Sequence, residues 1–283
     1  MPADLGGKDQ GVIGEHVLAG YEPGAGGREA LRLARAVVAL TGGRLTVAHV
    51  HPPDRPAAAG EALAVLRQAE DLLTETAPEV SADFVAQEAR GVGRGLSTLA
   101  SRAGADLIVI GSQEGGAHGR VAIGAAGDNL LHASNEAVMI TPAGYEPPER
   151  LGRITLSYVR RPQADEAVER TAQAALALDV PLRLITLLVG DGEARGRLND
   201  DLALAIRHAQ DSSGLPPEAV TAELAEGGDV ADALSDVPWP EGELLVLASS
   251  EDASAHQVFL GEMALKVLRA ASCPVAVLPR GYS

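Results

Sequence analysis

The sequence predicts an α/β protein built from two similar halves, each an open, doubly wound parallel sheet of five strands. Three observations lead to this prediction. The chain repeats itself at a fixed offset, 248 − 111 = 137, which aligns 106-DLIVIGSQE-114 with 243-ELLVLASSE-251. Strand-like and helix-like segments alternate within each half. The runs 107-LIVI-110 and 244-LLVL-247 are continuously apolar, which indicates strands covered on both faces and therefore paired in parallel.

The first half gives its elements in a clear order. After a strand over 16–21 comes 22-EPGAGG-27, where three glycines and a proline predict no regular structure. An amphipathic helix is expected over 28–40, and Gly42 ends it. Further strands are expected over 45–50, 83–87, 107–110 and 137–141, and further helices over 61–76, 93–102 and after Val121.

The same order recurs in the second half, for example in 182-LRLITL-187, which aligns with 45-LTVAHV-50. The stretch 142-PAGYEPPERLG-152 is rich in Pro and Gly, which is typical of a linker. We therefore expect one domain over 1–142, a linker over 143–152 and a second domain over 153–283. Each domain is long enough to bury a core of its own.

Composition excludes several classes of protein. The formal net charge of −16 argues against a nucleic-acid partner, which needs clustered Lys and Arg. Cys273 is the only cysteine, so neither an intrachain disulfide nor a Cys-based zinc site is possible. No stretch approaches the roughly 20 apolar residues that cross a bilayer, and the first ten residues do not resemble a signal peptide. We therefore expect a cytoplasmic protein without a membrane partner.

The loop after the fourth strand is the first place to look for a ligand. In doubly wound sheets, ligands bind outside the carboxyl ends of the strands, where the strand order reverses. The loop 111-GSQEGGAHGRVAIGAAGD-128 is rich in glycine and precedes a helix. This pattern fits backbone amides presented to an anion, although a flexible turn explains the glycines equally well.

The strand order, the 106-DLIVIGS-112 strand and the Cys-Pro strand near the C-terminus resemble a tandem universal stress protein over nearly the whole chain. The resemblance implies two Rossmann-like domains, of the adenine nucleotide alpha hydrolase-like type. Members that bind ATP carry Gly-x-x-Gly, nine residues, and then Gly-Ser or Gly-Thr, which hold the phosphates. An Asp after the first strand approaches the ribose and phosphates, and backbone groups of the second strand hold adenine.

The first half of this chain keeps part of the motif that the resemblance implies. Gly111 and Gly124 match, whereas Glu114 replaces the second glycine and Ala125 replaces the hydroxyl residue. Glu22 stands at the aspartate position. The candidate cofactor-binding residues are Glu22, Val50, Gly111, Ser112, Glu114, Gly124 and Ala125. A carboxylate about 5 Å from a phosphate charge costs roughly 3 kcal/mol at an effective dielectric near 20. We therefore expect ATP to bind weakly or not at all.

The second half keeps less of the motif. Ala248, Glu251, Glu262 and Val159 replace the first glycine, the second glycine, the hydroxyl residue and the aspartate, and only Gly261 survives. We expect this half to hold no nucleotide. Glu114 and Glu251 occupy equivalent positions in the repeat. Either both were inherited from one ancestor that preceded the duplication, or both are tolerated surface residues, or each carboxylate replaces the missing phosphate at the N-terminus of the following helix.

These residues favour a non-catalytic, stress-response binding or regulatory protein with degraded nucleotide sites, no cofactor and no metal. The alternative is an ATP-binding protein that carries nucleotide and Mg²⁺ only in the first half, with slow hydrolysis. His49 and His51 could offer imidazoles to zinc, but without a third ligand a solvated strand end is favoured. The resemblance also implies that the apolar last strands, 137-AVMIT-141 and 275-VAVL-278, pack together and that the chain forms a homodimer.

Overall fold

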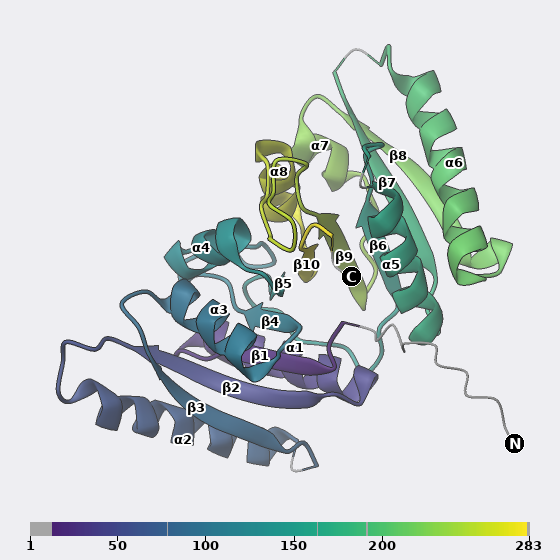
Figure 1. Ribbon diagram of the computed structural model, residues 1–283. Coiled ribbons are helices and arrows are strands. Elements are labelled where there is room, and N and C mark those ends of the chain that lie inside the picture. Colours follow the sequence, from purple (N-terminus) through teal and green to yellow (C-terminus); the bar gives the residue numbers. More distant parts are fainter. Residues whose placement is uncertain (1–12, 78, 163, 191, 282–283) are drawn as a thin grey trace, which may run out of the picture.

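The computed structural model describes residues 13–77, 79–162, 164–190 and 192–281. Its two halves follow the predicted alternation (Figure 1). The first half consists of β1 (His16–Gly20), α1 (Ala25–Thr41), β2 (Arg44–His51), α2 (Ala58–Thr76), β3 (Ala82–Glu88), α3 (Val92–Ala103), β4 (Leu107–Ile110), α4 (Ala125–Ala133) and β5 (Ala137–Ile140). The second half consists of β6 (Arg153–Ser157), α5 (Ala164–Ala177), β7 (Leu182–Val189), α6 (Arg195–Ser213), β8 (Val220–Gly227), α7 (Val230–Ser235), β9 (Glu243–Ala248), α8 (Glu262–Ala270) and β10 (Val275–Leu278).

All ten strands form one continuous sheet in the order β3-β2-β1-β4-β5-β10-β9-β6-β7-β8. Within each half the neighbouring strands are parallel, as the apolar runs predicted. The strand order reverses next to β1 and next to β6. The doubly wound architecture is therefore confirmed, with the two five-stranded sheets joined into one.

The halves meet at their last strands, and this part of the prediction is confirmed. β5 and β10 pair antiparallel, and Met139 stands opposite Ala276. These two residues are equivalent in the repeat, since 276 − 139 = 137, so a pseudo-twofold axis passes between them. The pairing uses both apolar edges within one chain, and β3 and β8 become the outer edges of the sheet. A homodimer must therefore use another surface, and it stays a prediction.

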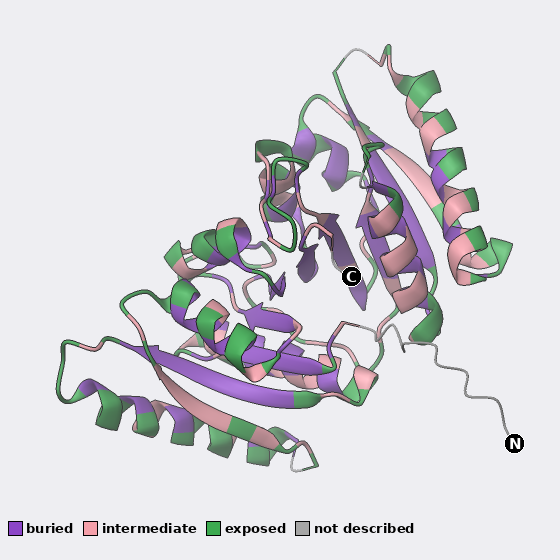
Figure 2. Ribbon diagram, in the orientation of Figure 1, coloured by how far each residue is buried: buried purple, intermediate pink, exposed green. Residues whose placement is uncertain are grey.

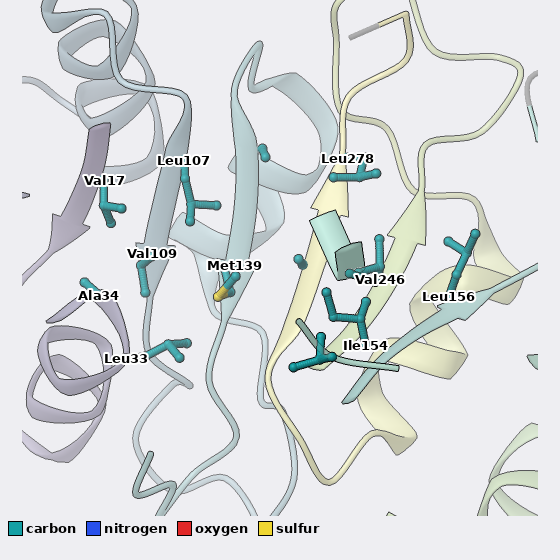
Figure 3. Packing of buried hydrophobic residues seen from close by; sticks show 14 of the residues in the cluster. Val17, Leu33, Ala34, Leu107, Val109, Met139, Ile154, Leu156, Val246 and Leu278 are labelled. Carbon is teal, nitrogen blue, oxygen red and sulfur yellow. The ribbon is translucent and has the colours of Figure 1, made fainter. Parts of the chain in front are cut away.

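Two apolar layers cover the sheet. One contains residues of α1 and α2 on top of β1 and β2, and the other contains residues of α3 and α4 on the opposite face. Both layers run across the β5–β10 junction into the second half, so the central strands are buried throughout (Figure 2). Figure 3 shows Met139 between Val109 of the first half on one side and Ile154 and Val246 of the second half on the other. The two halves therefore share a core.

The start of α1 differs from the prediction. The helix begins at Ala25, so three residues of the glycine-rich turn are helical. The first turn of a helix tolerates glycine because its N–H groups have no intrahelical partner. The glycines are needed for space: a Cβ on Gly27 would overlap the Glu22 carbonyl. Gly42 ends the helix in the left-handed conformation, with φ 68°, as predicted.

The second half carries a buried ionic cluster. Glu243, at the start of β9, has a fully buried side chain and accepts hydrogen bonds from Arg183 Nη2 (3.0 Å), Arg153 Nη2 (2.7 Å) and Thr155 Oγ1. Arg183 also pairs with Glu223 at 2.9 Å and lies under Trp239. α7 spans only 6 residues where α3 spans 12.

Candidate functional site

A cavity lies at the carboxyl ends of β1 and β4, where the sequence predicted a ligand site. It measures ≈ 530 Å³. Its walls come from the β1–α1 loop, the end of β2, the start of α3 and the loop that joins β4 to α4. Six of the seven candidate cofactor residues discussed above line it in the region of the loops: Glu22, Gly111, Ser112, Glu114, Gly124 and Ala125. Val50 lines its other side.

Two helix N-termini meet at this cavity. The residues of the first turn of α1 and of α4 are part of its wall, and no side chain caps either helix in the described structure. The first-turn N–H groups therefore lack both intrahelical and side-chain partners. Each helix end carries a partial positive charge of about half a unit. Such a pair of helix ends is a suitable environment for an anion.

Close backbone packing explains the glycines that frame the cavity. A Cβ on Gly111 would overlap the Gly26 carbonyl, and a Cβ on Gly26 would overlap the Ser112 carbonyl. The β1–α1 loop and the β4–α4 loop can touch only because both positions are glycine. Contact between two loops thus explains Gly26 and Gly111, whereas Gly115 and Gly119 have positive φ in open space, as in turns.

Glu114 lies in the cavity, but beside a different helix from the one predicted. Its carboxylate rests against Gly24, the N-cap residue of α1, so closely that a Cβ at Gly24 would overlap it. The neighbouring Gln113 takes the place at α4, with Oε1 3.1 Å from a Cβ built on Gly124. The reason is that the β4–α4 loop packs across the cavity onto the β1–α1 loop. Glu114 remains exposed to solvent.

Glu22 stands at the cavity rim at the end of β1. Its side chain is 71% exposed, and Oε2 lies 3.3 Å from His49 Nδ1. The same nitrogen lies 3.0 Å from the Tyr21 carbonyl oxygen. Both partners are acceptors, so Nδ1 carries the hydrogen. His49 and His51 are buried, and the expectation of a solvated strand end is wrong for both, because β2 lies between β1 and β3.

Ser112 is engaged in structure rather than free for a ligand. Its buried hydroxyl donates to the Thr141 carbonyl at 2.6 Å and accepts from the Ala122 N–H at 3.0 Å. Ser249 makes the same two contacts in the second half, with Leu278 and Phe259. The serine therefore ties the β4–α4 loop to the end of β5. Ser112 also lies in the cavity wall, and its assignment as a cofactor contact stays a prediction.

The opposite side of the cavity is apolar. Val50, Leu96, Ile110 and Ile140 line it. Gly95 is adjacent, and a Cβ there would lie 2.7 Å from Val50 Cγ1, so α3 approaches β2 closely at this point. The cavity therefore has an apolar end and an amide-rich end, which is the polarity of a nucleotide: a flat base and a charged tail.

The second half has a cavity of ≈ 420 Å³ at the equivalent place, with different walls. Val159 and Arg161 replace Glu22 and Gly24, and Met263 replaces Ala126. Glu251 does not line it; its backbone carbonyl accepts a hydrogen bond from Arg280 Nη1 at 2.6 Å. The nucleotide motif does not include Met263 or Val189, so the motif alone does not predict this apolar lining.

Among the described residues, no three His, Cys, Asp or Glu side chains are grouped so that they could hold a metal ion. No helix in the described part of the chain is long and apolar enough to cross a membrane.

Comparisons with known proteins agree with the architecture. The universal stress protein family matches residues 15–142. Universal stress proteins of Mycobacterium tuberculosis and Mycobacterium bovis are each 30% identical to this chain, over 93% of its length and 99% of theirs. A universal stress protein from Archaeoglobus fulgidus has a similar structure, with a TM-score of 0.66 at 16% identity, covering 95% of this chain and 99% of that one. A protein of unknown function from Pseudomonas aeruginosa has a TM-score of 0.65 at 16% identity, covering 94% and 93%.

The relatives match both halves, and the solved structures share the paired architecture over nearly the full length. The solved structures share the fold of this chain. The chain belongs to the universal stress protein family.

Proposed function

We propose that this chain is a non-catalytic, stress-response binding protein whose first-half cavity has the form of an adenine nucleotide site but binds nucleotide weakly. The observation that carries the proposal is the position of Glu114. Its carboxylate lies in the cavity, against the N-terminus of α1, where the amides would otherwise meet an anion. The apolar end of the cavity suits a base and the amide-rich end suits phosphates, but the negative charge of Glu114 repels the phosphates.

The size of the effect follows from Coulomb's law. A carboxylate about 5 Å from one phosphate charge costs roughly 3 kcal/mol at an effective dielectric near 20. A micromolar site is worth about 8 kcal/mol, so this repulsion moves affinity toward the millimolar range. Ala125 adds to the loss because it offers no hydroxyl, which is worth about 1 kcal/mol. Nucleotide in the first half would then be a weak ligand.

A second candidate keeps ATP in the first half through a divalent cation. Glu22 and Glu114 are the carboxylates of the cavity wall, and both are exposed to solvent. A cation between Glu114 and the phosphates would turn the repulsion into an attraction. This candidate requires that ATP binding depend strongly on Mg²⁺.

Titration calorimetry with ATP, with and without Mg²⁺, tests both candidates. The matched variants are Glu114→Gln and Glu251→Gln, which change the same repeat position inside and outside the nucleotide-like cavity. We expect millimolar affinity for the wild type, an increase of about 10–100-fold in Glu114→Gln, and no change in Glu251→Gln. A wild-type dissociation constant near or below about 1 μM would contradict the proposal. Loss of Mg²⁺-dependent binding in Glu114→Gln would favour the second candidate.

A further inference from the structure

We propose that the second-half cavity binds a small apolar carboxylate, such as a medium-chain fatty acid, rather than a nucleotide. The cavity measures ≈ 420 Å³ and lies at the carboxyl ends of β6, β7 and β9. This volume falls within the range of about 300–1,000 Å³ that is typical of small-molecule sites. Its floor consists of buried aliphatic side chains: Leu156, Leu247 and Val267.

The mouth of the cavity is unusually apolar for a solvent-facing surface. The described structure has eight exposed large apolar side chains: Leu40, Leu63, Val92, Val159, Leu176, Val189, Leu204 and Met263. Three of the eight, Val159, Val189 and Met263, line this one cavity, and they are 48%, 39% and 49% exposed. They come from three separate elements, β7, α8 and the β6–α5 loop. Exposed apolar groups gathered around a concave site indicate a surface that a ligand covers.

Charge distinguishes this cavity from its counterpart. Among the described residues, Arg161 is the only charged one in its wall, whereas the first-half cavity is lined by Glu22 and Glu114. Arg161 is exposed, and its side chain makes no hydrogen bond or ion pair with the described residues. The adjacent Arg160 is engaged by Asp201 at 3.2 Å. An unengaged guanidinium beside an apolar cavity suits a carboxylate joined to a hydrocarbon body.

Some positions at which the second half departs from the nucleotide motif also line this cavity. Val159 replaces an acidic position at the rim, and Arg161 brings a cation where the first half has Gly24. Ala248 places a methyl group where the first half has Gly111, at the closest contact between the two loops. Relative to the first half, these positions of the second-half cavity therefore carry apolar side chains in place of glycine or glutamate, and a basic residue in place of an acidic wall.

Titration calorimetry with decanoate, below its micellar concentration, tests the proposal on the full chain. Decylamine serves as the comparison, because it has the same hydrocarbon chain and the opposite charge. We expect decanoate to bind at least tenfold more tightly than decylamine. Arg161→Gln should remove this preference, while Arg160→Gln should preserve it. Met263→Asp should weaken decanoate at least tenfold, and Leu204→Asp, which changes an equally exposed apolar residue on α6, should not.

These variants alter exposed side chains, so circular dichroism should show native folding for all four. Three results would each overturn the proposal: no decanoate binding to the wild type at 1 mM, equal affinities for decanoate and decylamine, or equal effects of Met263→Asp and Leu204→Asp. ATP should not compete with decanoate. Competition by ATP would place decanoate in the first-half cavity and would also overturn it.

Discussion

Neutralising Glu243 should destabilise the protein far more than its single atom change suggests. The Glu243 side chain is fully buried and accepts hydrogen bonds from Arg153, Thr155 and Arg183, whose own side chain is 3% exposed. In Glu243→Gln, an amide NH₂ replaces one carboxylate oxygen and faces guanidinium donors. Glu223 alone would then balance the buried Arg183 charge. Breaking a buried ion pair by removing one partner typically costs about 3–5 kcal/mol.

A loss of this size corresponds to a fall in melting temperature of roughly 6–20 °C for a domain of 150–250 residues. Chemical denaturation and thermal melting of Glu243→Gln measure it. The matched control is Glu241→Gln, since Glu241 is exposed and lies two residues earlier in the chain. The control should change the free energy of unfolding by less than about 0.5 kcal/mol. If Glu243→Gln also lowered the free energy of unfolding by less than about 1 kcal/mol, the buried ionic cluster would not be a major source of stability in the second half.

Three further predictions concern single positions. Cys273 is buried, and burial raises the pKa of its thiol to about 12, so Ellman's reagent at pH 8 should modify it only as fast as the protein unfolds; rapid modification of the native protein would contradict this. Ser112→Ala leaves the Thr141 carbonyl without its donor and should cost about 1–3 kcal/mol by denaturant titration, with ATP affinity unchanged by calorimetry. His256 has φ 58°, and the equivalent Gly119 has φ 72°, so His256→Gly should stabilise the protein by about 1 kcal/mol, whereas Gly119→His should lower its melting temperature.

The repeat and the apolar runs were sufficient to predict the architecture. A continuous run such as 107-LIVI-110 can be buried only if both faces of its strand are covered, so parallel pairing followed from four residues. The 137-residue offset then assigned the same topology to both halves. The apolar last strands predicted their own pairing, because an open apolar edge is unstable in water. These are properties of local sequence, which the tertiary structure does not change.

The location of the first-half cavity was also predictable, because strand order fixes where loops meet. The orientation of its side chains was not. Glu114 lies against Gly24, which is ninety residues earlier in the chain, and not at the helix that follows it. Ser112 looked available for a ligand, yet its hydroxyl is engaged by Thr141 and Ala122. Both outcomes depend on how a loop packs against residues far away in the sequence. The spacing of residues within one loop does not predict such a contact.

The sequence alone predicted the topology, the resemblance to the family and the places where the two cavities lie. Only the tertiary structure showed that the two cavities differ in kind. Val159, Val189 and Met263 are separated in the chain, and each by itself is an ordinary exposed apolar residue. The fold brings them to one rim beside Arg161. Periodicity assigns a residue to a face of its own helix or strand, whereas a cavity forms from several elements, and its chemistry appears only when those elements are packed together.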